Sequence, residues 1–245
     1  MLTSVNNPKV KEWKKLHKRK YRDKSGTFLV EGLHLVEEVL KSEWKVLEIL
    51  IRDGENFDLK LNEQVTIVNE QVFNAVSQTQ TPQGIAAVVE RKTNQYQPAA
   101  LTLLVDSVQD PGNLGTLIRT ADAAGFDHVV IGEGSVDPFN EKTVRSTQGS
   151  LFHIPVFQGN LESFVDKLKA TGVTVLASAL EKNATPYKQL SKHDRTALIV
   201  GNEGQGIRGE LLSYADQRVY IPIYGQAESL NVAIAAAILM YHLKE

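Results

Sequence analysis

The sequence from Leu198 to His242, LIVGNEGQGIRGELLSYADQRVYIPIYGQAESLNVAIAAAILMYH, carries three consecutive signals that decide the fold. The apolar run Leu198–Val200 ends in the glycine-rich turn GNEGQG, which is how an α/β sheet presents a ligand loop at its carboxyl edge. A second short strand is predicted at 219–223. From Ser229 a helix begins that has no charge before Lys244. Because this helix is apolar all round, we expect partners on two of its sides, and a second subunit is the simplest supplier of one of them.

Strand and helix patterns alternate through the region before this stretch. Apolar runs typical of strands lie at 101–106, 127–131, 152–156 and 174–177. Helical patterns lie between them at 114–124, 141–149 and 161–170. This alternation is typical of an α/β domain with a parallel sheet, which we therefore predict for residues 101–245.

A smaller α/β unit is predicted in the first part of the chain. Its strand patterns lie at 27–30, 46–51, 65–68 and 84–89, and its helical periods at 33–40 and 70–76. The segment KTNQYQPAA, residues 92–100, has no apolar period and is typical of a linker. We therefore predict one domain at 1–91, a linker at 92–100 and a second domain at 101–245.

Composition excludes several classes of site. The 245 residues include no cysteine, which excludes disulfides, thiolate zinc sites and cysteine nucleophiles. The six histidines are scattered and no cluster has metal-ligand spacing, so we expect no metal. We expect a cytoplasmic protein without a membrane span, because no apolar run except the short terminal helix approaches roughly 18 residues. The first residues are also charged, unlike a secretory signal.

Charge is unevenly distributed along the chain. The net charge of −2 argues against nucleic acid as a partner, but residues 1–24 carry +7 and the remainder −9. A basic segment on an acidic body is typical of an RNA-facing arm, although a solvated helix is the alternative. Trp13 is expected either to stack on a base or to anchor this arm on its domain. The predicted RNA contacts of the arm are Lys14, Lys15, Lys18 and Arg19.

Three short motifs occur in an order that resembles one family. GNEG at 201–204, Ile221-Pro222 and SLNVA at 229–233, with Asn113-x-Gly115-x-x-x-Arg119 upstream, resemble the SpoU (TrmH-like) branch of the SPOUT RNA methyltransferases. The resemblance covers about Leu101 to Leu243. It implies a C-terminal trefoil knot, a rare feature that no apolar pattern announces. In addition, FLVEG at 28–32 and TPQG at 81–84 resemble the L30e-like substrate-binding domain that precedes many SpoU domains.

The resemblance also implies a cofactor and a site. S-adenosylmethionine is expected in a bent shape against the backbone of Gly201, Ile221 and Leu230, although Ile221 and Leu230 could equally be ordinary core residues. The reaction implied is methyl transfer to a ribose 2′-hydroxyl. The residues that match the family's active-site positions are Arg119, Asn113, Glu203, Ser229 and Asn231.

The chemistry of Arg119 has two interpretations. In the family picture Arg119 is the base that takes the hydroxyl proton. Lowering the pKa of a guanidinium from its ordinary, strongly basic value to about 7 would cost roughly 7 kcal/mol. Arg119 could instead clamp the adjacent phosphate and the developing alkoxide, and the sequence does not choose between the two.

A further segment, Arg145-Ser146-Thr147-Gln148-Gly149, matches a family segment near the active site. Arg145 is expected to contact RNA. The pair Thr147-Gln148 departs from the commoner Ser-Ala pair of the family, which leaves the contacts of that pair open.

Three functions follow from these observations. The first is 2′-O-methylation of a guanosine in 23S rRNA, and the second is 2′-O-methylation of a tRNA. The third is a non-catalytic RNA-binding ribosome-assembly factor, against which the intact set of Asn113, Arg119, Glu203 and Asn231 argues. A nicotinamide dinucleotide enzyme is disfavoured, because the glycine-rich loop follows a late strand and lacks the acidic ribose ligand.

The terminal helix predicts how the protein assembles. Leu230, Ile234 and Ile238 form one apolar row, and a second row on another side consists of Val232, Ala236, Leu239 and Leu243. The resemblance implies a homodimer as well. We therefore predict an obligate homodimer through this helix and the helix of Arg119, which an Ala236→Arg substitution is expected to disrupt.

Overall fold

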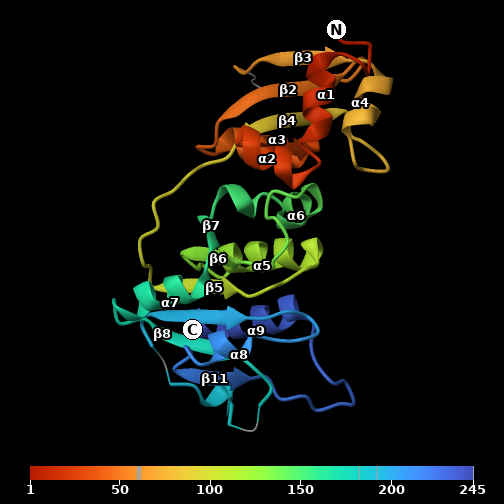
Figure 1. The fold of residues 1–245 in the computed structure, drawn as a ribbon. Helices are drawn as coiled ribbons and strands as arrows, with labels where there is room; N and C mark the ends of the chain where they lie inside the picture. The colour runs from red at the N-terminus through yellow and green to blue at the C-terminus, as the bar shows by residue number, and fades with distance from the viewer. Residues whose placement is uncertain (60–61, 182, 192, 245) are drawn as a thin grey trace. The chain divides into compact units, whose positions relative to one another are not determined.

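The computed structural model describes residues 1–59, 62–181, 183–191 and 193–244 (Figure 1). The chain forms two compact units. The first consists of Met1–Thr93 with Asp137–Phe152, and the second of Asn94–Val136 with His153–Glu245.

The first unit is built on a mixed sheet with the strand order β1-β4-β2-β3. Strand β4 is antiparallel to both β1 and β2, whereas β3 is parallel to β2. The strands are β1 (Thr27–Glu31), β2 (Val46–Arg52), β3 (Val65–Val68) and β4 (Ile85–Glu90). The helices formed by residues 1–93 are α1 (Pro8–Lys15), α2 (Arg19–Ser25), α3 (Leu33–Lys41) and α4 (Glu70–Val76). This is the small α/β unit that the sequence predicts.

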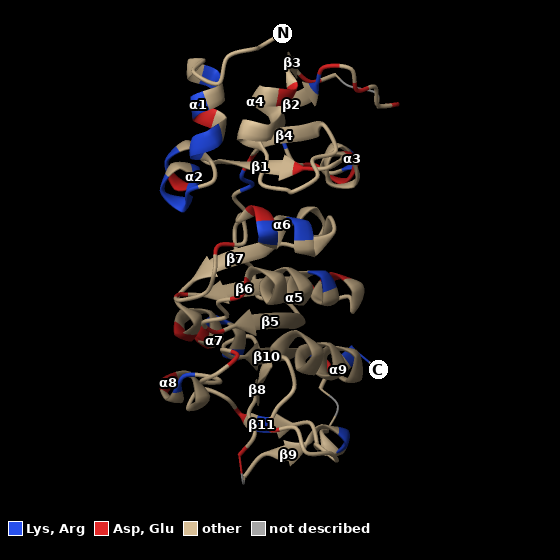
Figure 2. Cartoon of the chain, turned by 90° about the vertical axis from the view of Figure 1, so that its right-hand side faces the viewer, with Lys and Arg blue, Asp and Glu red and all other residues tan. Residues whose placement is uncertain are grey.

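The basic N-terminal segment is two helices that belong to this unit. Figure 2 shows the Lys and Arg residues of α1 and α2 in blue. The opposite face of α1 is apolar: Val10, Trp13 and Leu16 are 0%, 3% and 6% exposed and pack with Val72 and Phe73 of α4. Trp13 therefore anchors α1 on the first unit, which is one of the two alternatives predicted from the sequence.

Residues 137–152 pack in the first unit, although the sequence analysis placed them in the second domain. They form α6 (Glu141–Thr147) and a short 3-10 helix, η1 (Ser150–Phe152). Asp137 accepts hydrogen bonds from Arg22 Nε and Nη2 at 2.9 and 2.6 Å, and both residues are buried. The ring of Phe139 lies 4.9 Å from that of Phe28. The predicted boundaries at 91 and 101 thus do not account for this segment.

The second unit is built on seven parallel strands in the order β7-β6-β5-β10-β8-β11-β9. This confirms the predicted α/β domain with a parallel sheet. The trefoil knot stays a prediction. The strands are β5 (Leu101–Val105), β6 (His128–Gly132), β7 (Val156–Gly159), β8 (Thr174–Ser178), β9 (Thr185–Pro186), β10 (Thr196–Val200) and β11 (Gln217–Tyr220).

Two predicted strands of this unit differ from the observed strands in the residues at which they begin or end. The strand predicted at 152–156 begins only at Val156, because Pro155 has no N–H and enters the sheet edge only through its carbonyl, which accepts from Val129 N at 3.0 Å. The strand predicted at 219–223 is β11, which ends at Tyr220, two residues before Pro222.

Helices cover both faces of the parallel sheet. On one face α5 (Pro111–Ala123) and α9 (Val232–Lys244) share a core with the inward side chains of β5, β6 and β10. On the other face α7 (Leu161–Lys169) and α8 (Gly209–Leu212) pack on β6, β8 and β10. A further 3-10 turn, η2 (Tyr187–Gln189), follows β9. In the described part of the chain no helix is long and apolar enough to cross a membrane.

Helix α9 has one buried and one exposed apolar row. Ala236 and Leu239 are 0% exposed and belong to the core of their own unit. On the outer side Ile234 is 53% exposed and Tyr241 50%. The expectation that Ala236→Arg would act on a subunit interface was therefore wrong, because Ala236 already lies inside this chain.

Candidate active site

The first turn of α5 holds Asn113 at the carboxyl edge of the parallel sheet. Asp110 caps the helix, because its Oδ1 accepts from Asn113 N at 2.9 Å, and Pro111 suits the first helical position. Only four residues separate the end of β5 from Asp110–Pro111. The cap therefore fixes where the amide group of Asn113 lies.

Glu203 lies in the loop after β10 and accepts hydrogen bonds from the start of α5. Its Oε1 accepts from Asn113 Nδ2 at 2.9 Å and from Asp110 N at 3.3 Å, and its Oε2 from Gln109 N at 3.4 Å. Partial burial acts to raise the pKa of the Glu203 carboxyl, but these hydrogen bonds together outweigh it and hold the pKa below its ordinary value. The site therefore keeps a carboxylate at neutral pH.

Asn231 completes a chain of three side chains. Its Nδ2 donates to Asn113 Oδ1 at 3.0 Å, while its own Oδ1 accepts from Ala233 N at 2.9 Å and caps α9. Asn113 thus accepts from Asn231 and donates to Glu203. Three of the predicted catalytic residues, which lie far apart in the sequence, meet at one place in the second unit.

Arg119 and Ser229 stand outside this chain of hydrogen bonds. Arg119 follows Asn113 by six positions on α5, which is about 9 Å along the helix axis. Its side chain is exposed, and no described residue forms a hydrogen bond or ion pair with it. Ser229 is exposed in the segment that leads into α9. The guanidinium of Arg119 is therefore free to bind a group of another molecule.

Two of the predicted cofactor residues line one cavity at the ends of β8 and β11. The cavity has a volume of about 130 Å³, and its walls include Leu180, Ile221, Ile223, Ser229 and Leu230. No described residue accepts a hydrogen bond from the backbone N–H groups of 223–230. This segment therefore combines apolar side chains with unpaired backbone donors, as sites for small ligands do.

Gly201, the third predicted cofactor residue, does not line this cavity. A Cβ at Gly201 would lie 2.3 Å from the carbonyl carbon of Gly206 and 2.4 Å from Ile207 N. Asn202 and Gly206 exchange two backbone hydrogen bonds of 2.9 and 3.0 Å that close the loop. The glycine is thus required by the chain's own backbone, a reason other than close approach to a ligand.

The sequence did not indicate an ion pair beneath the same loop, between buried Asp106 and the 42% exposed side chain of Arg208. Asp106 is 0% exposed and accepts from both Arg208 N and Arg208 Nε at 2.8 Å. Asn202 Nδ2 donates to the carbonyl of Ser107 at 2.8 Å. These bonds tie the loop after β10 to the end of β5. The one available signal was an aspartate directly after the apolar run 101–105.

A second cavity of the second unit lies on the same edge of the sheet. It has a volume of about 460 Å³ and is lined by Ser107, Gln109, Asn202 and residues 205–209. The backbone of Ser107 is in the left-handed region, with φ 59°, where non-glycine residues are uncommon. The carboxyl edge of the sheet therefore offers a second cavity, next to the loop that carries Glu203.

Arg145 lies in the first unit, on α6. It lines a cavity of about 310 Å³ with Glu31, His34 and Gln83, and its Nη1 is buried without a hydrogen-bond partner. In the same segment Thr147 is buried and donates to Val144 O at 2.7 Å. Gln148 ends the helix in a left-handed conformation, with φ 51°. The geometry thus gives Thr147 and Gln148 local structural contacts.

The predicted RNA contacts of the arm differ in their surroundings. Lys14, Lys15 and Lys18 are exposed, and Arg19 Nε lies 3.7 Å from Asp23 Oδ2. Lys15 lines a cavity of the first unit, described below. Among the described residues no group of three or more His, Asp or Glu side chains could hold a metal ion.

Known proteins resemble the chain over its whole length. Residues 100–241 match the SpoU rRNA Methylase family, and residues 7–87 match the MRM3-like substrate binding domain. A Bacillus subtilis (strain 168) protein named 23S rRNA (guanosine(2553)-2′-O)-methyltransferase RlmP is 55% identical over 245 residues, which is 99% of this chain and 98% of that protein.

Solved structures also resemble the chain over almost its whole length. The crystal structure of an AdoMet-bound rRNA methyltransferase from Sinorhizobium meliloti is 34% identical, with a TM-score of 0.89, over 99% of this chain and 96% of that one. The SpoU methyltransferase AviRb from Streptomyces viridochromogenes, in complex with AdoMet, is 24% identical over 98% and 97%, with a TM-score of 0.88, and supports the fold alone. The motifs, the fold and these matches together show that the chain belongs to the SpoU rRNA methylase family.

Proposed function

We propose that this protein transfers a methyl group from S-adenosylmethionine to the ribose 2′-hydroxyl of a guanosine in 23S rRNA. The observation that carries the proposal is the chain of hydrogen bonds Asn231–Asn113–Glu203 at the carboxyl edge of the sheet. The full-length similarity to the Bacillus subtilis 23S rRNA enzyme supports the choice of substrate.

The segment 221–230 fits the cofactor. Ile221 and Leu230 supply apolar walls, and the unpaired backbone N–H groups of 223–230 supply donors for a polar ligand. Gly201 acts indirectly, because it permits the tight loop that carries Glu203. S-adenosylmethionine, when bound, supplies a methyl group on a sulfonium, which is a good leaving group.

The side chains of the site have separate tasks in this proposal. Glu203 holds Asn113, and Asn231 holds the opposite end of the same amide, so Asn113 has one fixed orientation. The exposed guanidinium of Arg119 binds the phosphate next to the target ribose and stabilises negative charge that develops on the 2′-oxygen. The alternative in which Arg119 takes the proton predicts that Arg119→Lys restores part of the rate at high pH. A clamp predicts no such recovery.

We propose that the active form is a homodimer joined through α9. Ile234 and Tyr241 are about half exposed on α9, and Leu230 is 38% exposed just before it. A row of large apolar side chains left in water on an otherwise buried helix is a typical subunit contact. The sequence predicts that α5, the helix of Arg119, lies in the same interface.

Methyl transfer from radiolabelled S-adenosylmethionine tests the function. The acceptor is RNA from cells that lack the gene, and the modified nucleotide is mapped by 2′-O-methyl-sensitive primer extension. One guanosine of 23S rRNA should gain the label. Label in tRNA instead would favour the tRNA alternative. RNA binding without S-adenosylmethionine binding in calorimetry would favour a non-catalytic assembly factor.

A further inference from the structure

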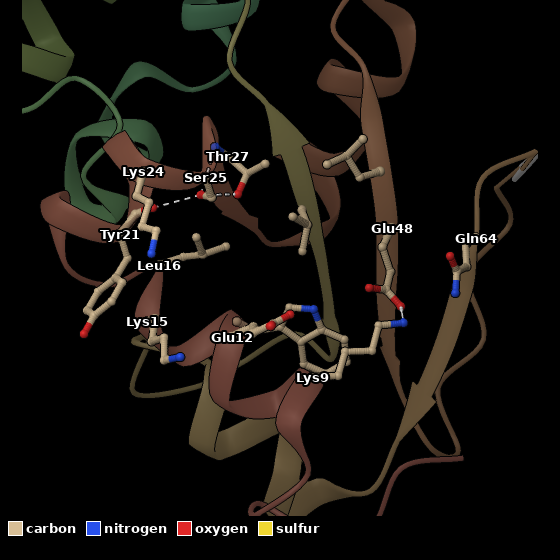
Figure 3. Close-up of a pocket in the computed structure, with 13 residues that line it drawn as sticks. Lys9, Glu12, Lys15, Leu16, Tyr21, Lys24, Ser25, Thr27, Glu48 and Gln64 are labelled. Atoms are coloured by element: carbon tan, nitrogen blue, oxygen red, sulfur yellow. Dashed lines mark hydrogen bonds and ion pairs between the residues drawn. The ribbon is translucent and has the colours of Figure 1, made fainter.

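The first unit contains a cavity between the two basic helices and the sheet. Its volume is about 590 Å³, and Figure 3 shows it open between α1 and α2 on one side and Glu48 and Gln64 on the other. Leu16 and Val88 contribute apolar surface. We call it the α1–α2 cavity. Its volume falls in the range of about 300–1,000 Å³ that sites for small ligands occupy.

Two lysines on the wall of the α1–α2 cavity lack an acidic partner among the described residues. Neither Lys15 nor Lys24 forms an ion pair with a described residue, and both are exposed. Other basic residues of the unit are paired, for example Lys45 with Glu90 at 2.6 Å and Lys92 with Glu43 at 2.8 Å. The cavity therefore carries positive charge that the protein does not neutralise.

The acidic residues of the cavity offset only part of this charge. Glu48 is 7% exposed and is already held by Lys9 Nζ and Thr66 Oγ1. Glu12 lies on the wall of α1, and no described residue donates to its carboxylate. A ligand with an anionic end and a hydrogen-bond-donating end would satisfy Lys15 and Lys24 at one end and Glu12 at the other.

Aromatic side chains add a third kind of contact. Tyr21 lines the cavity, and Lys15 Nζ lies 5.8 Å from the centre of its ring. Trp13 also lines it and is only 3% exposed, yet its indole N–H donates to no described residue. The indole nitrogen of Trp13 is not one of the buried polar atoms that lack a partner, so its N–H reaches solvent and is available to a ligand.

We propose that the α1–α2 cavity binds one unstacked nucleotide of the substrate RNA. The base lies in the cavity, with its edge toward Glu12 and Trp13, and its phosphate lies on Lys15 and Lys24. Splayed-out bases that rest on aromatic and apolar side chains are the usual targets of sequence-specific RNA recognition. The proposal rests on the proposed function, because it takes the partner to be RNA, and it adds a recognition site away from the methylated ribose.

A pair of double variants tests the phosphate contacts. Lys15→Gln with Lys24→Gln removes the two lysines of the cavity. Lys11→Gln with Lys20→Gln removes two exposed lysines from the same two helices that do not line it. Both variants lose the same charge. For the one phosphate of the bound nucleotide, the slope of log affinity against log salt should become shallower by about 0.7 in the first variant. The second should keep the wild-type slope.

The base contact is tested with 2-aminopurine in the full-length protein. A 23S rRNA fragment that contains the methylated guanosine carries 2-aminopurine at one unpaired position at a time. At one position the wild type and Lys11→Gln/Lys20→Gln should change its fluorescence several-fold. Thr27→Phe, which fills the cavity from β1, should abolish that change and raise the KM for RNA at least five-fold at unchanged kcat.

The outcomes separate this proposal from the proposed function. If the wild type transfers methyl groups but the two lysine pairs behave alike, or no 2-aminopurine position responds, the α1–α2 cavity does not bind a nucleotide. If the wild type transfers no methyl group although the cavity variants lose RNA binding selectively, the proposed function fails and the cavity proposal stands.

Discussion

Asn231 Nδ2 donates to Asn113 Oδ1 at 3.0 Å, which connects the start of α9 to the start of α5 across 118 residues of sequence. The same Asn231 caps α9 through its Oδ1. One side chain thus begins a helix with one atom and orients a residue of the active site with another, so its two tasks can be separated by substitution.

Asn231→Ser should keep the cap and lose the bond to Asn113. Asn231→Ala should lose both, at a cost of about 0.5–2 kcal/mol in the free energy of unfolding. We expect methyl transfer to fall by about ten-fold in both variants, the equivalent of about one hydrogen bond. Urea denaturation and kcat/KM measure the two effects. Asn160, which caps α7 by accepting from Ser163 N at 2.9 Å, is the control: Asn160→Ala should lose stability and keep activity. Full activity of Asn231→Ser would contradict an orienting task.

Glu203→Gln should change how stability depends on pH. The folded-state pKa of Glu203 lies below the ordinary value of 4.5, so its contribution to stability is present above pH 4.5. It is lost as the pH falls through the lower folded-state pKa. Between pH 7 and pH 3 the wild type should therefore lose more unfolding free energy than Glu203→Gln. The difference should stay below about 1 kcal/mol, because the carboxylate is exposed. Equal losses would show that the hydrogen bonds to Glu203 do not stabilise the carboxylate.

Arg208→Ala should destabilise the protein by about 1–3 kcal/mol, because buried Asp106 would lose its charged donor at Arg208 Nε and keep only Arg208 N and Ser107 Oγ. Arg218→Ala is the matched control, since Arg218 and its partner Glu181 have side chains 37% and 38% exposed. We expect that control to lose less than about 1 kcal/mol. Thermal unfolding of both variants measures the difference, and a larger loss in Arg218→Ala would contradict the importance of the pair that holds buried Asp106.

Ile234→Arg should convert the proposed homodimer into monomers while each chain stays folded, because Ile234 is 53% exposed. Sedimentation velocity at micromolar concentration, with circular dichroism as the test of folding, measures this. Val65→Arg, at a residue 39% exposed on strand β3 of the first unit, should sediment like the wild type. A monomeric wild type with full methyl-transfer activity would refute the proposed dimer.

The fold class could be predicted because buried parallel strands appear in the sequence as short apolar runs. The run Leu198–Val200 lies within β10, and the run at 101–106 contains β5. The errors in the predicted strands and helices have local causes. Strand β7 begins only after Pro155, later than predicted. Helix α8, at Gly209–Leu212, was not predicted because it is too short to show a helical period.

The site was only partly predictable. Asn113, Glu203 and Asn231 came from the order of the motifs and do meet in space. Asp106 and Arg208 are 102 positions apart and have no periodic signal, so only the fold brings them together. The α1–α2 cavity depends on how α1 and α2 lie on the sheet, which residue spacing does not determine.

The packing of residues 137–152 in the first unit determines how the protein can be dissected. Cutting the chain in the segment 92–100 would leave Asp137–Phe152 on the fragment that lacks Phe28, Trp44 and Arg22. That fragment would expose the rings of Phe139 and Phe152 and leave Asp137 without its arginine. Neither half obtained by a single proteolytic cut would be a faithful substitute for the whole, so binding studies on isolated halves would measure damaged surfaces.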